Sequence, residues 1–258
     1  MTYRFLNLAI EERLAVVQLN RAAARNALSQ ALMRELLHCA RDLADRIDID
    51  VVLLTGNEQG FSAGADLKDE RSWTDDTLSL VARRQIASLG YRMCQAWEGM
   101  PQITIAAIEG YAIGGGLALA LACDWRVSAD DAFVSLPEIA LGIPLTWGTI
   151  PRLTSLLGPA QAKRLTILCE RVPAARALAI GLVDYTVPKS QAMTKAREIA
   201  AQTLAMPAAV VRMSKESVNA VASALSRATG YAAHDQLVLA AGSAESRAAR
   251  HAALKIRE

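Results

Sequence analysis

Two short strands, each followed by a loop of small residues and then a helix, place the strongest limit on how this chain folds. Val51 to Thr55 is an apolar run closed by Gly56, and Ile103 to Ile108 is an apolar run rich in β-branched residues. Short apolar runs bounded by glycine are typical of buried strands. A glycine-rich turn from Gly110 to Gly116 follows the second run. This alternation predicts an α/β fold.

The remaining elements follow the same rhythm up to about residue 189. Leu28, Leu32 and Leu36 open an apolar series at helical spacing that reaches Ile47, and Ser29 is its expected N-cap. Further strands are predicted at residues 3–8, 14–19, 125–127, 132–135 and 183–187. Further helices are predicted at residues 77–97, 117–121, 191–204, 207–225 and 231–256. Two more helices are predicted between residues 149 and 168, separated by Gly158-Pro159.

The strand pattern stops at about Ser190. Residues 1–189 are therefore expected to form a core that contains the strands, and residues 190–258 an all-helical region. The tail is apolar enough to need a partner surface, either in its own core or on another subunit.

Composition excludes several classes of protein. Hydrophobic residues make up 52% and charged residues 21% of the 258 residues, which favours a packed core over disorder. The net charge is +2 without a basic run, so nucleic acid is not expected as a partner. No Cys or His pattern typical of a metal site occurs, so no metal is expected. The longest apolar stretch, Gly110 to Cys123, is too short for a bilayer, which takes about 20 residues, and we expect a cytoplasmic protein without membrane contact.

Two loops carry the residues from which a function can be predicted. Residues 61–67, Phe-Ser-Ala-Gly-Ala-Asp-Leu, contain only small side chains between Ser62 and Ala65, so a ligand can approach the backbone closely. Residues 113–117, Ile-Gly-Gly-Gly-Leu, open a helix, and the first N–H groups of a helix are unpaired. Either loop alone is a weak signal, and on their own the glycines of residues 114–116 are more typical of a tight turn that needs close packing. Neither matches a dinucleotide fingerprint or a P-loop. Together they can form an oxyanion hole, in which each donor contributes roughly 3–4 kcal/mol to a transition state.

These loops and several other segments resemble the crotonase superfamily, the family of enoyl-CoA hydratases and isomerases. The resemblance runs in order over nearly the whole chain, through Asn20-Arg21, Asn26 to Leu28, Ser62 to Asp66, Gly110 to Gly116, Leu136 to Glu138, Leu141-Gly142 and Gly181 to Asp184. It implies a spiral of ββα modules and an all-helical C-terminal region, residues 190–258, that packs subunits into homotrimers or homohexamers. It also implies an acyl-CoA thioester as substrate, with no other cofactor.

The resemblance assigns roles to four residues. The N–H groups of Ala65 and Gly115 would hold the thioester carbonyl oxygen. Hydratases of the family use two glutamates, and the residues at those positions here are Ala118 and Glu138. A methyl group neither donates nor accepts a proton, so one acid/base is lost at Ala118. The apolar neighbours of Glu138 indicate partial burial, which would raise its pKa toward that of a general base.

One carboxylate is enough for a different reaction. It can move a proton between C2 and C4 of a 3-enoyl-CoA, which makes isomerisation chemically better supported than hydration. We interpret Asp66 and Asp124 as structural, and keep Asp69 and Glu70 as minority candidates for an acid near the cavity. Two alternatives stay open: a non-catalytic acyl-CoA-binding protein, and another crotonase-fold activity that uses an unrecognised acid.

The two ends of the substrate have weaker candidates. At the CoA end we expect Arg21, Arg25, Ala63 and Lys68, and Lys255 from a neighbouring subunit, although solvated surface charge explains each basic residue equally well. At the acyl end the bulky side chains of Leu145 and Trp147 either line or shorten the pocket, or pack beneath it.

Overall fold

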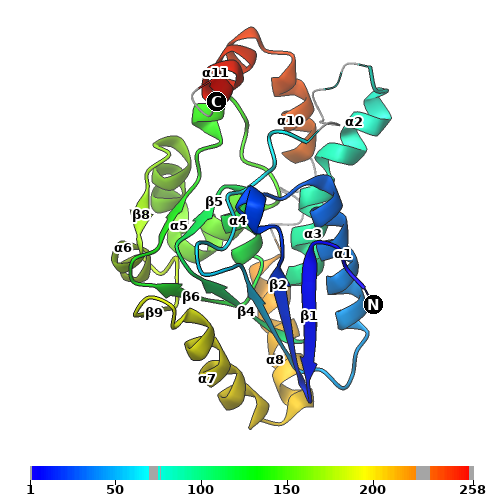
Figure 1. Cartoon of the computed structure of the whole chain (residues 1–258), viewed down its shortest axis with the longest axis vertical. Coiled ribbons are helices and arrows are strands. Elements are labelled where there is room, and N and C mark those ends of the chain that lie inside the picture. Colours follow the sequence, from blue (N-terminus) through cyan, green and yellow to red (C-terminus); the bar gives the residue numbers. More distant parts are fainter. Residues whose placement is uncertain (1, 70–74, 76, 225–232, 256–258) are drawn as a thin grey trace.

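The computed structural model describes residues 2–69, 75, 77–224 and 233–255. Within these residues the main sheet has six strands in the order β1-β2-β3-β4-β6-β9 (Figure 1). All neighbours pair in parallel except β1 and β2, which are antiparallel. The strands are β1 (Leu6–Glu11), β2 (Leu14–Leu19), β3 (Val51–Thr55), β4 (Ile103–Ile108), β6 (Trp125–Ala129) and β9 (Tyr185–Val187). A second sheet of three short strands joins β5 (Tyr111–Ile113), β7 (Phe133–Ser135) and β8 (Val172–Pro173).

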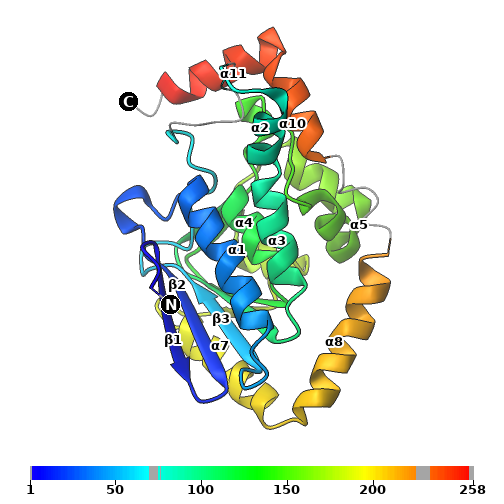
Figure 2. The same cartoon turned by 90° about the vertical axis from the view of Figure 1, so that its right-hand side faces the viewer.

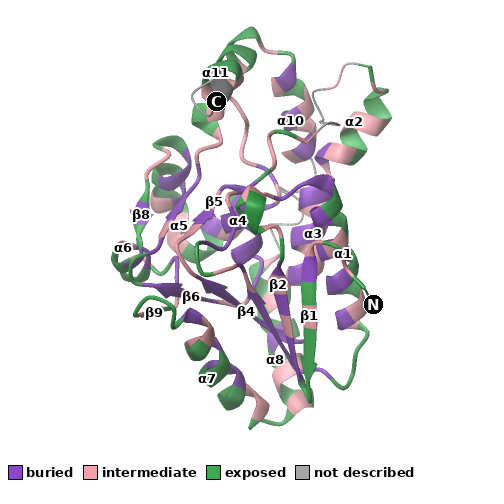
Figure 3. Cartoon of the chain, viewed as in Figure 1, coloured by how far each residue is buried: buried purple, intermediate pink, exposed green. Residues whose placement is uncertain are grey.

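Helices cover both faces of the main sheet, which explains why its central strands are apolar without interruption. Successive side chains of a strand point to opposite faces. Val52 and Leu54 pack with α1 (Gln30–Ala44) and α3 (Leu89–Glu98), whereas Val51 and Leu53 pack with α7 (Ala192–Leu204). Figure 2 shows α1 and α3 side by side on one face, and Figure 3 shows β4 and β6 buried between the layers. No described helix is both long and apolar enough to cross a bilayer.

Most predicted helices are present, with breaks that the periodicity did not predict. Ser29 caps α1, since its hydroxyl accepts a hydrogen bond from Leu32 N at 3.3 Å. The helix predicted at 77–97 is two helices, α2 (Leu80–Ala87) and α3, which meet at Ser88. The two helices predicted between 149 and 168 both lie within α5 (Thr149–Ile167), and the predicted break at Gly158-Pro159 is confirmed by the non-helical backbone of Gly158, where φ is +74°. β8 and α6 (Ala174–Ala179) were not predicted, and η1 (Ala22–Ala24), η2 (Ile139–Leu141) and α4 (Gly115–Ala120) are the other short helices.

The predicted all-helical region divides into parts that pack differently. α7 buries Ala192, Ala196 and Ala200 against the main sheet, so it belongs to the same packing unit as the strands. The boundary predicted at residue 190 is therefore not a boundary in packing. The helix predicted at 231–256 is two helices over its described residues, α10 (Ala233–Ala241) and α11 (Ala244–Lys255). α10 packs on α2 and α11 on η2, above the core (Figure 1).

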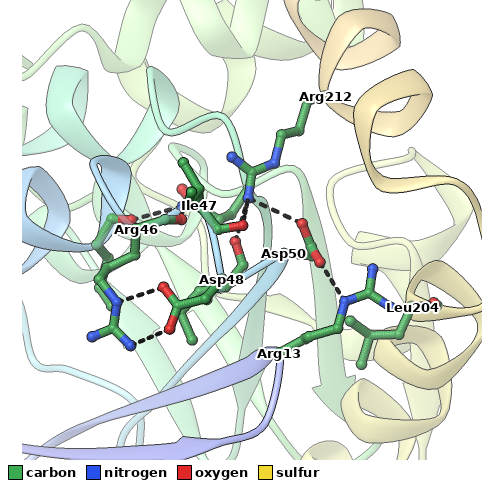
Figure 4. Close-up of polar contacts among 10 residues, drawn as sticks. Arg13, Arg46, Ile47, Asp48, Asp50, Leu204 and Arg212 are labelled. Carbon is green, nitrogen blue, oxygen red and sulfur yellow. Dashed lines mark hydrogen bonds and ion pairs between the residues drawn. The ribbon is translucent and has the colours of Figure 1, made fainter.

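The remaining helix of this region, α8 (Ala208–Ala222), is attached to the core through polar contacts. Arg212 donates to Ile49 O at 2.6 Å and to Asp50 Oδ1 at 3.0 Å, and Asp50 also pairs with Arg13 (Figure 4). Lys215, which is buried, donates to Asp124 at 2.6 Å. The core-facing side of α8 thus carries two charged side chains beside Val211, which packs on the core, while its outward side exposes Val210, Met213, Val218 and Val221.

Candidate active site

The two loops singled out in the sequence lie next to each other beyond the carboxyl ends of β3 and β4, the edge where ligands bind in open parallel sheets. Ile113 N donates to Ser62 O at 3.0 Å, and Ser62 forms a parallel bridge with Ala112. Gly64 has a φ of +90°, and a β-carbon on it would lie 2.6 Å from Ile113 O. Glycine at this position therefore allows both the left-handed backbone and the close approach of the two loops.

The N–H of Ala65 is directed away from the chain that pairs with the first loop. Leu28 N donates to Gly64 O at 2.7 Å, and Leu28 O accepts from Asp66 N at 3.2 Å. In an extended segment the N–H between two such bonds points to the opposite side. Among the residues that the structure describes, the N–H of Ala65 has no acceptor.

The N–H of Gly115 begins α4 and is unpaired in the same way within the described chain. Gly114, with a φ of +53°, precedes it and donates to Ser135 O at 2.8 Å. A β-carbon on Gly64 would lie 3.3 Å from Gly115 N, so the two loops meet at this nitrogen. Ala65 and Gly115 both line one cavity of about 270 Å³.

Glu138 lines the same cavity and is the carboxylate best suited to proton transfer there. Its Oε2 is buried without a hydrogen-bond partner in the described residues. Burial raises the pKa of Glu138 to about 7, because the charged form loses its solvation. A carboxyl group that titrates near neutral pH can both take up and return a proton.

Ala118 lines the cavity three residues beyond Gly115, on the same face of α4. Its side chain is buried. The residue at this position therefore presents a methyl group to the cavity, and that group can take no part in proton transfer.

The other candidate acids are held by structural contacts. Asp66 pairs with Arg21 at 2.7 Å and accepts from Lys68 N at 3.0 Å. Asp124 accepts hydrogen bonds from Thr104 and Lys215. Asp69 caps α1, because its Oδ2 accepts from Gln30 N at 2.6 Å, and it is not among the cavity-lining residues. Glu70 lies outside the described residues.

The residues expected at the CoA end surround the outer side of the first loop. Arg25 is exposed, and its carbonyl accepts from Ala63 N at 3.0 Å, while Ala63 lines the cavity. Lys68 is exposed two residues beyond Asp66. Arg21 is the least free of these groups, since it also donates to Ala27 O at 2.8 Å. The side chain of Lys255 lies outside the described part of the chain.

Comparison with known proteins assigns this arrangement to a family. The model of the enoyl-CoA hydratase/isomerase family matches residues 9–254. The chain belongs to the enoyl-CoA hydratase/isomerase family. It is 34% identical over 220 residues to the crotonyl-CoA hydratase of Syntrophomonas wolfei, covering 85% of this chain and 83% of that protein. It is 33% identical over 210 residues to the short-chain-enoyl-CoA hydratase of Clostridium acetobutylicum, covering 81% and 78%.

Solved structures of the family have the same fold. The crystal structure of an enoyl-CoA hydratase from Bacillus anthracis superposes with a TM-score of 0.79 at 32% identity, covering 92% of this chain and 90% of that one. An enoyl-CoA hydratase from Mycobacterium avium subsp. paratuberculosis superposes with a TM-score of 0.87 over 98% and 97%, at 24% identity. The expected crotonase-type fold with a helical C-terminal region is confirmed.

Several cavity-lining residues of this family member were not predicted from its sequence. Leu237 of α10 and Arg250, His251 and Ala253 of α11 form part of the cavity wall. They carry no motif. The packing of α10 on α2 brings Leu237 there, and the packing of α11 on η2, where Arg250 donates to Gly142 O at 3.4 Å, brings the other three. The wall is completed by two expected residues, Leu145 and Trp147, and by others such as Leu67, Ile113, Pro137, Leu141, Ile143, Pro144, Thr146 and Thr149.

Proposed function

We propose that this family member isomerises enoyl-CoA thioesters, with Glu138 as its single acid/base. The observation that carries the proposal is the buried, unpartnered carboxylate of Glu138, with a pKa raised to about 7, in the cavity that Ala65 and Gly115 also line. The membership of the chain in the enoyl-CoA hydratase/isomerase family supports an acyl-CoA substrate.

The proposed reaction moves one proton. The ionised Glu138 removes a proton from C2 of a 3-enoyl-CoA, and the C–H electron pair enters the conjugated dienolate. The N–H groups of Ala65 and Gly115 donate hydrogen bonds to the negative thioester oxygen. Protonated Glu138 then returns the proton to C4, the double bond moves to C2=C3, and the carboxylate is regenerated.

Hydration of a 2-enoyl-CoA is expected to be slow. Addition of water requires the oxygen to be activated while a proton is delivered to C2. With Ala118 in the cavity wall, Glu138 would have to do both. The loss of one positioned acid/base typically costs about 10²–10⁴-fold in rate.

The test compares two reactions of the purified protein. We expect 3-butenoyl-CoA to be converted to 2-butenoyl-CoA at enzyme-like rates, and hydration of 2-butenoyl-CoA to be at least about 10²-fold slower. Glu138→Gln keeps the shape of the side chain but cannot take a proton, so it should abolish the isomerisation. Rapid hydration by the wild type, or isomerisation that survives in Glu138→Gln, would contradict the proposal.

A second candidate function is non-catalytic binding of acyl-CoA, and Ala118 is the observation that favours it. A protein with this function would keep the N–H groups of Ala65 and Gly115 for a thioester carbonyl and would have lost turnover. It would bind a 3-enoyl-CoA with the same affinity before and after the Glu138→Gln substitution and would form no product with either.

The CoA end of the ligand is proposed to lie along the outer side of the first loop. Arg21, Arg25 and Lys68 offer positive charge there, and Ala63 leaves room for the pantetheine chain to pass. Arg25 and Lys68 are exposed, whereas Arg21 is already paired with Asp66, so we assign the phosphate contacts to Arg25 and Lys68. A role for Lys255 of a neighbouring subunit remains part of the proposal.

The protein is also proposed to be a homotrimer or homohexamer. α8 supports this, because its charged Arg212 and Lys215 face the core while four large apolar side chains are exposed, which is unusual for a solvated surface helix. Met213→Glu, at a side chain that is 65% exposed, should lower the oligomer mass measured by light scattering if subunits meet there. An unchanged mass would place the contact elsewhere.

A further inference from the structure

The indole ring of Trp147 lines the cavity and fills a slot between two helices, α3 and α4. A β-carbon added to Gly90 of α3 would overlap the five-membered part of the ring, and a β-carbon added to Gly115 of α4 would overlap its six-membered part. Trp147 therefore lies against the backbone of both helices at once.

Close approach of the ring accounts for glycine at both positions. Neither Gly90 nor Gly115 has a positive φ, so backbone conformation does not call for glycine at either one. Any larger residue would meet the indole. The slot and the ring match each other, although Gly90, Gly115 and Trp147 come from three separate segments of the chain.

The backbone around Trp147 is held in an unusual conformation. Trp147 has a φ of +60° and Gly148 a φ of +71°, and the left-handed region is rare for a bulky side chain. Arg152 Nη1 donates to Trp147 O at 2.8 Å. The guanidinium of Arg152 is largely buried and makes two further hydrogen bonds to the carboxylate of Glu98, at 2.9 and 2.8 Å. This ion pair fixes the carbonyl of Trp147 and with it the direction of the indole.

The position of the Trp147 ring relative to the thioester carbonyl decides whether the ring limits the length of the acyl chain. A thioester carbonyl held by the N–H of Gly115 would place its acyl chain next to the ring that packs on Gly115. The walls around that chain are apolar, with Leu145, Ile143 and Leu237 contributing. The volume of the cavity, about 270 Å³, lies just below the range for small-molecule sites, about 300–1,000 Å³.

We infer that Trp147 closes the acyl end of the cavity and restricts the substrate to thioesters of short linear acyl groups. The inference deepens the proposed function and rests on it for the position of the carbonyl. Without the ring, the slot between α3 and α4 would be an apolar space open to a longer chain, and apolar cavities of this kind stay dry and take apolar ligands.

The test measures the affinity of saturated acyl-CoAs by calorimetry, so that it does not depend on turnover. The ligands are butyryl-, octanoyl- and dodecanoyl-CoA. In an open pocket each added methylene that is buried would raise the affinity roughly fourfold. For the wild type we expect the reverse, with octanoyl- and dodecanoyl-CoA binding at least tenfold more weakly than butyryl-CoA.

Two substitutions should change the length of acyl chain that the cavity accepts in opposite directions. Trp147→Gly empties the slot and should bring octanoyl-CoA to at least the affinity of butyryl-CoA. Gly90→Ala pushes the ring toward the ligand and should weaken butyryl-CoA as well. Ile150→Ala is the matched control, because Ile150 is exposed on α5 outside the cavity wall, and it should leave the series unchanged. If Trp147→Gly does not fold, Trp147→Phe replaces the indole with a smaller ring. It should let the cavity accept a longer acyl chain than the wild type, but by fewer methylenes than Trp147→Gly would.

The outcomes separate this inference from the proposed function. If no acyl-CoA binds to the wild type, the proposed function fails and the inference fails with it. If the wild type binds all three ligands with rising affinity, the proposed function stands and the stop at Trp147 is refuted. It is refuted equally if the folded Trp147 variants keep the wild-type order of affinities.

Discussion

The carboxylate of Glu138 packs directly against the backbone of Gly114, so closely that a β-carbon on this glycine would lie 2.6 Å from Oε1. Gly114 immediately precedes Gly115, which lines the cavity and whose N–H has no acceptor among the described residues. The proposed acid/base and one proposed oxyanion donor are therefore positioned by the same short segment.

Gly114→Ala should disturb the proposed acid/base, Glu138, more than the proposed oxyanion donor, Gly115. The new β-carbon displaces the Glu138 carboxylate, and a misplacement of about 1 Å can cost roughly 10²-fold in rate. We expect kcat for isomerisation to fall by at least that factor, while acyl-CoA affinity changes by a few-fold. Gly181→Ala is a matched control, because Gly181 also has a positive φ, +77°, but a β-carbon there meets nothing within 4 Å. It should lose stability through backbone strain and keep its kcat, and equal kcat losses in the two variants would contradict the assignment.

The raised pKa of Glu138 predicts a pH dependence of activity. The base must be ionised to remove a proton, and its pKa is about 7. kcat/KM for isomerisation should therefore fall tenfold per pH unit below about 7 and level off above it, since this ratio reports ionisation of the free enzyme. A midpoint near the ordinary glutamate value of 4.5 would indicate a solvated carboxylate and refute the role of burial.

The same burial predicts that Glu138 destabilises the protein at high pH. Its pKa is raised from 4.5 to about 7 in the folded state, so the folded state holds its proton more tightly and loses stability as pH rises through this window. At 1.36 kcal/mol per pH unit, the full penalty above pH 7 is about 3 kcal/mol. Glu138→Gln should remove this penalty. The free energy of unfolding should therefore rise above pH 7 and stay nearly unchanged below pH 4.5. Denaturant titrations at both ends of the window measure the difference.

Contact of Lys68 with the CoA phosphates predicts a selective loss of affinity. Lys68→Ala should raise KM for a CoA thioester by up to about fivefold, because an ion pair at an exposed site contributes about 0.2–1 kcal/mol. The matching pantetheine thioester has no nucleotide, so its KM should not change. A parallel rise for both substrates would place Lys68 away from the phosphates.

The strands were predictable where burial is continuous and long. β2, β3 and β4 lie at the residues predicted for them, because most positions in each strand are apolar. β8, with two residues, carries too little periodicity to be detected. The breaks at Ser88 and near Gly242 were missed because apolar spacing continues across them, and the packing of α10 on α2 and of α11 on η2 depends on residues far apart in the sequence.

The site was predictable where a short motif holds a backbone in place. The glycine and small residues around Ala65 and Gly115 indicated two adjoining loops, and the structure brings these loops together. The environment of Trp147 was not predictable, since its slot depends on Gly90, which lies on a helix with no motif of its own. The contribution of α11 to the cavity wall also depends on tertiary packing alone.

The central claim is that Glu138 removes a proton from C2 of a thioester whose carbonyl oxygen is held by the N–H groups of Ala65 and Gly115. Exchange of the C2 protons of butyryl-CoA with deuterium, followed by mass spectrometry in heavy water, measures this step without a double bond or added water. We predict exchange catalysed by the wild type and a loss of at least about 10²-fold in Glu138→Gln. Binding of butyryl-CoA without exchange by the wild type, or equal exchange by both proteins, would contradict the claim.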